Sequence, residues 1–410
     1  MNTETKKHVS LAIMMFMQFM LVAVWWVSLA AWLENMGASG DIKALVLSSM
    51  AIGSMASPLI GAFADRYLPA QRVLAIANLL TAALLAAAGF AAGSWWSFAF
   101  ILLAMLCYMP TWSLTSSIAL VHARRELFPR IRMFGTIGWV ASGLFSLAAV
   151  YGFGVEKFDG TTLPVFCGSA VALLAAALNL NLPNTPPAGA GKRLSLFQIL
   201  GLDAFWMLNK PDYRLFMLCS ILAMISFSMY YSFGSEFLQS CNYEYITLTM
   251  NWGQTVELFF LFFATTIIAR LGIRWAMAAG LAALTARYLS FWIGGVASIP
   301  ALYITGILFH GLIFGLFFVG GQIYTDRRAP AALRAQAQGM YSFIIWGLAL
   351  LAGNFFCRQL IDSYTSVDAA GVKIYDWNTI FGMVTGVAAF TTLFFIFSFK
   401  EINENKASTN

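Results

Sequence analysis

Charged side chains are scarce in this chain: Asp, Glu, Lys and Arg make up 10% of its 410 residues, whereas hydrophobic residues make up 60%. A soluble globular domain carries about 25% charged residues, so a surface exposed to water on all sides is excluded. The apolar residues form long runs, many of which reach the roughly 20 residues needed to cross a bilayer core. The composition therefore predicts a membrane protein with many spans.

Metal-ligating and catalytic patterns are missing as well. The five cysteines lie in or beside apolar runs, and none shows a CxxC or Cys/His spacing: Cys107, Cys167, Cys219, Cys241 and Cys357. We interpret them as packing residues. No phosphate-binding loop, zinc motif or nucleophile elbow occurs. We therefore expect neither enzyme activity nor a metal or other cofactor.

Twelve apolar segments have the length of a membrane-spanning helix, and each is expected to be helical because unpaired backbone groups are costly in hydrocarbon. They lie near residues 9–33, 43–64, 73–93, 96–121, 132–153, 162–182, 213–237, 246–269, 275–295, 299–323, 336–360 and 377–399. The first is longer than the apolar part of a signal peptide, which has about 7–15 residues. We interpret it as an uncleaved first span.

A segment rich in proline, glycine and basic residues separates the first six spans from the last six. We predict a six-helix bundle over residues 1–182, a cytoplasmic linker over 183–211 with an interfacial helix around Leu194–Leu208, a second bundle over 212–400, and a tail over 401–410. Loop arginines repeat at similar offsets: Arg66 and Arg270 are 204 residues apart, and Arg124 and Arg327 are 203 apart. This spacing favours two parallel six-helix pseudo-repeats with a site between them, although the charge bias of membrane loops alone would produce a similar pattern.

The basic residues predict the orientation. With these spans, 19 of the 24 Lys and Arg residues fall on one side, and Lys43, Lys157, Arg358 and Lys373 fall on the other. Because cytoplasmic loops carry the excess of basic residues, we expect both termini and the linker in the cytoplasm. The formal net charge of +6 is explained by these short loops, and we expect no nucleic-acid partner.

Ionisable residues inside apolar spans are the strongest indication of function, because charge is costly at the bilayer centre. Glu257 is the clearest example, and Gln254 lies on the same helical face. Glu257 would carry a proton or bind a solute rich in hydrogen-bond donors; the alternative is a structural ion pair with Arg287 in the next span. His310 shares a face with Phe314, and either relays a proton or bonds a neighbouring helix.

Arg132, Thr136 and Trp139 recur at helical spacing along one face of the fifth span. A guanidinium, a hydroxyl and an indole on one face suit a planar polar ligand. The alternative makes Arg132 an anchor at the membrane surface and Trp139 a ring that faces lipid.

Several motifs carry a resemblance to known transporters. The segment Gly61-Ala-Phe-Ala-Asp65-Arg66 resembles the cytoplasmic loop signature of the major facilitator superfamily, where its role is gating and stability. The specific pieces elsewhere are Tyr108-Met-Pro-Thr111, Ile131-Arg-Met-Phe-Gly-Thr-Ile-Gly138, Leu200-Gly-Leu-Asp-Ala-Phe205, Gln254-Thr-Val-Glu257, Arg334-Ala-Gln-Ala-Gln-Gly-Met340 and Asp376-Trp377. With them, most of the chain resembles the bacterial nucleoside:proton symporter family of that superfamily.

The resemblance implies an all-α membrane protein of the cell inner membrane, with 12 transmembrane helices, that takes up nucleosides with protons by alternating access. It implies substrate contacts at Arg132, Thr136, Trp139, Gln254, Glu257 and Phe314, and at Ser228 and Tyr231, where the family has a Gln and an Asn. His310 stands where the family has a Tyr, and Gly315 stands where it has an Asp that matters for activity. Our hypothesis is that Glu257, alone or with His310, carries the proton.

Two other functions are compatible with the residues alone. One is a symporter or uniporter for another small polar solute, such as a sugar. The other is a receptor on a transporter scaffold that binds its ligand without moving it. In each case the expected partners are a small solute, protons and the lipid bilayer, and no obligate protein partner is expected.

Overall fold

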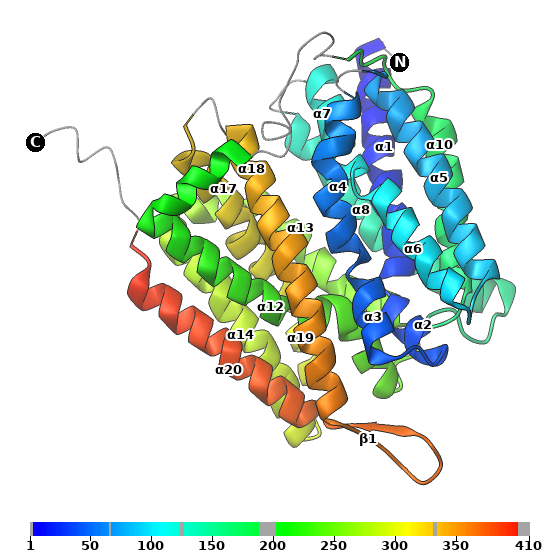
Figure 1. Ribbon diagram of the computed structural model, residues 1–410, viewed down its shortest axis with the longest axis vertical. Coiled ribbons are helices and arrows are strands. Elements are labelled where there is room, and N and C mark those ends of the chain that lie inside the picture. The colour runs from blue at the N-terminus through cyan, green and yellow to red at the C-terminus, as the bar shows by residue number, and fades with distance from the viewer. Residues whose placement is uncertain (1–2, 65–66, 124–126, 188–201, 331–333, 401–410) are drawn as a thin grey trace, which may run out of the picture.

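The computed structural model describes residues 3–64, 67–123, 127–187, 202–330 and 334–400, and most of these residues are helical (Figure 1). Among them, nine helical stretches are long and apolar enough to cross a membrane, and the shorter helix Leu163–Asn179 is apolar as well. The prediction of an all-helical membrane protein is confirmed.

The helices up to residue 179 form one group, on the right of Figure 1. They are α1 (Thr3–Trp26), α2 (Leu29–Asn35), α3 (Gly40–Leu47), α4 (Ser49–Ala64), α5 (Ala70–Phe90), α6 (Trp95–Tyr108), α7 (Thr111–His122), α8 (Phe128–Ala141), α9 (Gly143–Leu147), the π-helical η1 (Ala148–Gly152) and α10 (Leu163–Asn179). Several predicted spans are thus divided into two or three consecutive helical segments. The break between α6 and α7 falls at Pro110, which has no backbone N–H to continue the helical hydrogen bonds.

The second group lies on the left of Figure 1. It contains the 3₁₀ helix η2 (Leu202–Asn209), α12 (Pro211–Ser240), α13 (Ile246–Leu271), α14 (Ile273–Val296), α15 (Ala301–Leu308), α16 (His310–Leu312), the π-helical η3 (Ile313–Phe318), α17 (Val319–Arg328), α18 (Arg334–Ser342), the π-helical η5 (Phe343–Ala349), α19 (Leu350–Ser363) and α20 (Trp377–Ser398). Most of the predicted interfacial helix lies outside the described residues. Its last part forms η2.

A short β-hairpin that the sequence did not indicate joins α19 to α20. Strand β1 (Thr365–Val367) pairs antiparallel with β2 (Lys373–Tyr375), and it projects beyond the helices in Figure 1. Asp368 stabilises the turn, because its carboxylate accepts hydrogen bonds from the backbone N–H groups of Ala370 and Val372.

Many large apolar side chains are exposed on the outside of the molecule, and many polar ones are buried. Phe90 and Phe397 are 84% and 77% exposed, whereas Gln18, Asn78 and Arg287 are fully buried. Hydrocarbon does not expel apolar side chains, and a polar group must find its hydrogen bonds inside the protein. This distribution is the one expected of helices surrounded by lipid.

Helices α1 and α8 approach each other closely because of Gly138. A Cβ atom at this position would lie 2.1 Å from the backbone oxygen of Phe16, a contact that neither helix can relieve without moving. We expect Gly138→Ala to destabilise the protein by about 1–3 kcal/mol, the usual cost of overpacking, and to lower the midpoint of thermal unfolding in detergent. Gly386→Ala in α20 is the matched control, since nothing lies within 4 Å of its Cβ; equal midpoints for the two variants would contradict the prediction.

Candidate functional site

Glu257 lies near the middle of α13, and its side chain contacts His310 of α16. Its Oε2 is 3.4 Å from Nε2 of His310, and the same imidazole nitrogen is 3.3 Å from Nε2 of Gln254. Glu257 is 7% exposed and His310 is 3% exposed. The structure thus brings together the three polar residues predicted in the eighth and tenth spans.

The alternative partner proposed for Glu257 is not found. Arg287, in α14, donates from Nε to the backbone oxygen of Gly306 and lies over the ring of Tyr230, with its guanidinium carbon 4.6 Å from the ring centre. Among the described residues it has no carboxylate within ion-pair distance. The alternative of a Glu257–Arg287 ion pair is therefore wrong, and Glu257 contacts His310 instead.

Arg132 reaches the same region from α8, in the other group of helices. Its guanidinium carbon lies 4.1 Å from the ring centre of Phe19 in α1, and its charge interacts with that of Glu257. Thr136 and Trp139 follow on α8 and are both buried, so the interpretation of Trp139 as a ring that faces lipid is wrong. The side-chain amide of Asn251 in α13 donates to the backbone oxygen of Trp139 and thereby joins α13 to α8.

Aromatic side chains pack beside the Glu257–His310 contact. Five of them form what we name the aromatic cluster: Phe227, Tyr231, Phe314, Phe318 and Trp346. The ring of Phe314 stacks on that of His310, with centroids 6.1 Å apart and an interplanar angle of 17°. The indole of Trp346 lies 5.9 Å from the ring of Tyr231. Sequence reasoning missed Trp346, because a Trp in an apolar span is common and η5 changes the face that it presents.

Two positions that differ from the family pattern lie against neighbouring helices. The Ser228 hydroxyl donates to the backbone oxygen of Met224 and is turned toward Gly353 of α19, where an added Cβ would lie 2.4 Å from Ser228 Oγ. Its side chain thus faces α19. A Cβ at Gly315 would lie 3.1 Å from that of Phe260 in α13, so this position is closely packed.

A separate polar network lies inside the first group of helices. Gln18 of α1 exchanges two hydrogen bonds with Asn78 of α5, and also donates to the hydroxyl of Thr111 at 2.6 Å. The Tyr108 hydroxyl donates to the backbone oxygen of Gln18, and the Trp112 indole donates to Tyr108. This network is only weakly indicated in the sequence, by Gln18 within the first apolar span.

The loop motif Gly61–Arg66 lies only partly within the described residues. Gly61 lies in α4, and Asp65 and Arg66 are outside the described residues, so their gating role stays a prediction. Within the part of the chain that the structure describes, no group of three or more His, Cys, Asp or Glu side chains is arranged to hold a metal ion.

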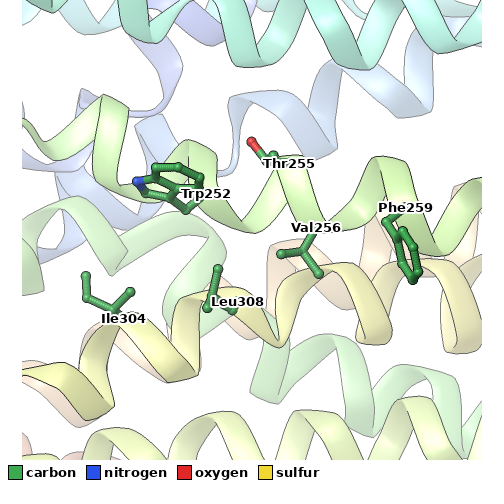
Figure 2. Close-up of a pocket in the computed structure, with 6 residues that line it drawn as sticks. All are labelled: Trp252, Thr255, Val256, Phe259, Ile304 and Leu308. Atoms are coloured by element: carbon green, nitrogen blue, oxygen red, sulfur yellow. The ribbon is translucent and has the colours of Figure 1, made fainter.

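A hollow of about 560 Å³ lies between α13 and α15, and Figure 2 shows the side chains that line it. The lining residues are Trp252, Thr255, Val256, Phe259, Ile304 and Leu308, and nearly all of the lining surface is apolar. Trp252 and Phe259 are exposed on the outside of the molecule. The hollow therefore faces the region that lipid occupies, and it contains neither Glu257 nor His310.

Long apolar helices that enclose buried ionisable side chains are expected of a membrane protein that binds or moves ions or solutes. The chain matches the model of the nucleoside H⁺ symporter family over residues 4–404. It therefore belongs to that family, as the motifs indicated, and it is a transporter and not an enzyme.

Individual relatives agree with this assignment. YegT of Escherichia coli (strain K12) is 32% identical over 409 residues, which cover 97% of this chain and 95% of that protein. The nucleoside permease NupG of the same organism is 26% identical, with 95% of each chain covered. The crystal structure of the nucleoside transporter NupG superimposes with a TM-score of 0.82 at 25% identity, over 98% of this chain and 100% of that one.

Proposed function

We propose that this symporter imports nucleosides by alternating access, and that Glu257, Gln254 and His310 form the point where solute and proton meet. The observation that carries the proposal is the 3.4 Å contact between Glu257, in the predicted span 246–269, and His310, in the long apolar stretch Ala301–Arg328. Buried ionisable groups in such helices mark the paths of ions and solutes.

The chemistry around Glu257 suits a nucleoside. The ribose hydroxyls and base N–H groups donate hydrogen bonds, which the carboxylate and the Gln254 amide oxygen accept. The Gln254 oxygen is buried and has no partner among the described residues, so it is available to a ligand. Arg132 supplies donors for a base carbonyl, and the aromatic cluster offers faces on which a flat base stacks. A sugar would use the polar groups but leave the aromatic faces without a flat partner.

The contact geometry also couples the proton to the solute. Nε2 of His310 faces both Glu257 and Gln254, and one imidazole nitrogen either donates or accepts a hydrogen bond. With a hydrogen on Nε2 it donates to the Glu257 carboxylate; without one it accepts either from the Gln254 amide or from a protonated Glu257. The position of the proton thus changes the hydrogen bonds that remain for the solute.

Alternation requires the two groups of helices to move relative to each other, and we propose that they are the two six-helix bundles of a twelve-span transporter, residues 1–182 and 212–400. Charged side chains join these bundles at one end in what we name the ionic cluster: Glu34, Lys43, Glu236, Arg358 and Lys373. This end bears the few basic residues predicted to lie outside the cytoplasm. We infer that the described state is closed toward the periplasm, with both termini in the cytoplasm.

A buried carboxylate strengthens the same closed end. Asp159, in the loop after η1, accepts hydrogen bonds from the backbone N–H of Thr247 at 3.1 Å and from its hydroxyl at 2.5 Å. Thr247 lies in the first turn of α13, so this contact ties the first bundle to the helix that bears Glu257. Burial raises the pKa of the Asp159 carboxyl, while its hydrogen bonds with Thr247 and Ser146 oppose the rise.

The test is uptake by the purified protein in liposomes with acid outside. We expect labelled uridine or another nucleoside to accumulate, an uncoupler to abolish accumulation, and an excess of nucleosides but not of sugars to compete. Accumulation that is indifferent to the uncoupler would contradict proton coupling. Competition by sugars alone would show that the solute is of another class, and saturable binding without uptake would indicate a receptor.

A further inference from the structure

Arg287 is a buried cation that the proposed transport site does not use. It lies in the middle of α14 and is fully buried. Its Nε donates to the Gly306 oxygen at 3.2 Å, and the Tyr288 side chain lies beside it. Both of its terminal nitrogens lack a hydrogen-bond partner among the described residues. A charge at membrane depth without a carboxylate partner is costly, and this cost suggests a role for Arg287 beyond packing.

The rings that cover Arg287 also contact His310. The guanidinium carbon lies 4.6 Å from the ring centre of Tyr230 and 5.6 Å from that of Phe227. The His310 ring lies 5.6 Å from Phe227 and 6.5 Å from Tyr230. Nδ1 of His310 is buried and has no partner within the described part of the chain. Arg287 and His310 thus contact the same two rings, and Glu257 contacts the imidazole of His310.

Within the second bundle, the charges in this region consist of one fixed cation, Arg287, and one exchangeable proton. The other titratable or charged side chains that face these three residues are Tyr230, Tyr231, Tyr288, Cys357, Arg132 and Tyr108. The tyrosines and the cysteine are neutral at ordinary pH, and Arg132 belongs to the other bundle. Within the second bundle, an ionised Glu257 therefore balances Arg287, and protonation of Glu257 or His310 leaves a net positive charge.

We propose that Arg287 is the positioning residue that sets the pH range of coupling, because its fixed charge acts through His310 on the proton shared with Glu257. This inference rests on the proposed role of Glu257 and His310. Arg287 itself contacts neither the solute nor the proton shared by Glu257 and His310. Its removal would make proton binding at this site easier, since a neighbouring positive charge opposes the gain of another.

The experiment compares Arg287→Met with the wild type in liposomes, using labelled uridine. Met is unbranched like Arg but shorter, and it leaves no charge in the core, a change that buried charged sites often tolerate. We expect the pH of half-maximal accumulation to move toward alkaline pH by about one unit, the order expected for loss of one nearby buried charge. Exchange of labelled for unlabelled uridine, which needs no net proton movement, should stay within about twofold of wild type if only coupling changes. Arg287→Lys keeps the charge and should restore the wild-type profile.

The outcomes separate this inference from the proposed function. Arg274→Met, at the start of the same helix, is the matched control and should leave the pH profile unchanged. An unshifted profile for Arg287→Met, or equal shifts for the Met and Lys variants, would overturn the role of Arg287 while leaving transport at Glu257 intact. A wild-type protein that does not accumulate nucleoside would overturn the proposed function and this inference together.

Discussion

Glu257→Gln is expected to abolish the accumulation of nucleoside against its gradient while leaving exchange of nucleoside across the membrane. Glutamine has nearly the same shape as glutamate and still bonds with His310 and a solute hydroxyl, but it neither ionises nor carries a proton. Proton binding is then no longer linked to solute binding. We expect accumulation to fall by about 100-fold, near the upper end of the coupling found between two sites in one protein.

The measurement uses liposomes with an imposed pH gradient and labelled uridine, with exchange assayed in the same preparation. Glu244→Gln is the matched control, because Glu244 is an exposed carboxylate in the loop just before α13. It should accumulate uridine like the wild type. Full accumulation by Glu257→Gln would show that another group carries the proton, and loss of exchange as well would show that Glu257 is needed to bind the solute.

The spans and the side chains that share a helix face could be predicted from the sequence, because both depend on contacts that are local in the chain. The apolar runs predicted most spans, because every backbone group in lipid must bond within its own helix. The three-residue spacing of Gln254 and Glu257 placed both on one face, and both contact His310. The four-residue spacing of His310 and Phe314 likewise predicted that they share a face, and in the structure their rings stack.

Contacts between distant segments could not be read from spacing. Helix periodicity does not say which neighbour a face meets, so Arg287 remained a candidate partner of Glu257 although its side chain contacts Gly306 and Tyr230. The π-helical segments η3 and η5 change the angular position of every later residue in their spans, which is why Trp346 was missed. In the sequence, Lys43 and Arg358 are notable only as two of the few basic residues on the side opposite the cytoplasm. Their partner Glu236 is 193 and 122 residues away.

Glu236→Gln is expected to destabilise the state in which the transporter is closed toward the periplasm. Glu236, near the end of α12, is almost fully buried and accepts from Lys43 at 3.1 Å, from Arg358 at 3.0 and 3.1 Å, and from the Tyr375 hydroxyl at 3.1 Å. A glutamine leaves the buried Lys43 and Arg358 without the carboxylate between them. Removing one partner of a buried ion pair costs about 3–5 kcal/mol.

That cost falls mainly on the state in which the two bundles meet, because separation of the bundles gives both cations access to water. A difference of about 3 kcal/mol changes the ratio of two states by roughly 150-fold. We therefore expect Glu236→Gln to populate a state that is open at this end and to slow net uptake. Distances between spin labels at Trp96→Cys and Val296→Cys, two exposed positions on the two bundles, would report the opening in a background without the native cysteines.

Asp41→Asn separates this effect from a general loss of surface charge, since Asp41 is exposed at the start of the helix that bears Lys43. Its label distances should match those of the wild type. Lys43→Met provides a second test, because it removes one cation and leaves Glu236 paired with Arg358, so the opening should be smaller than in Glu236→Gln. Unchanged distances in Glu236→Gln, with the protein folded and exchange intact, would show that the ionic cluster stabilises the fold without favouring either facing state.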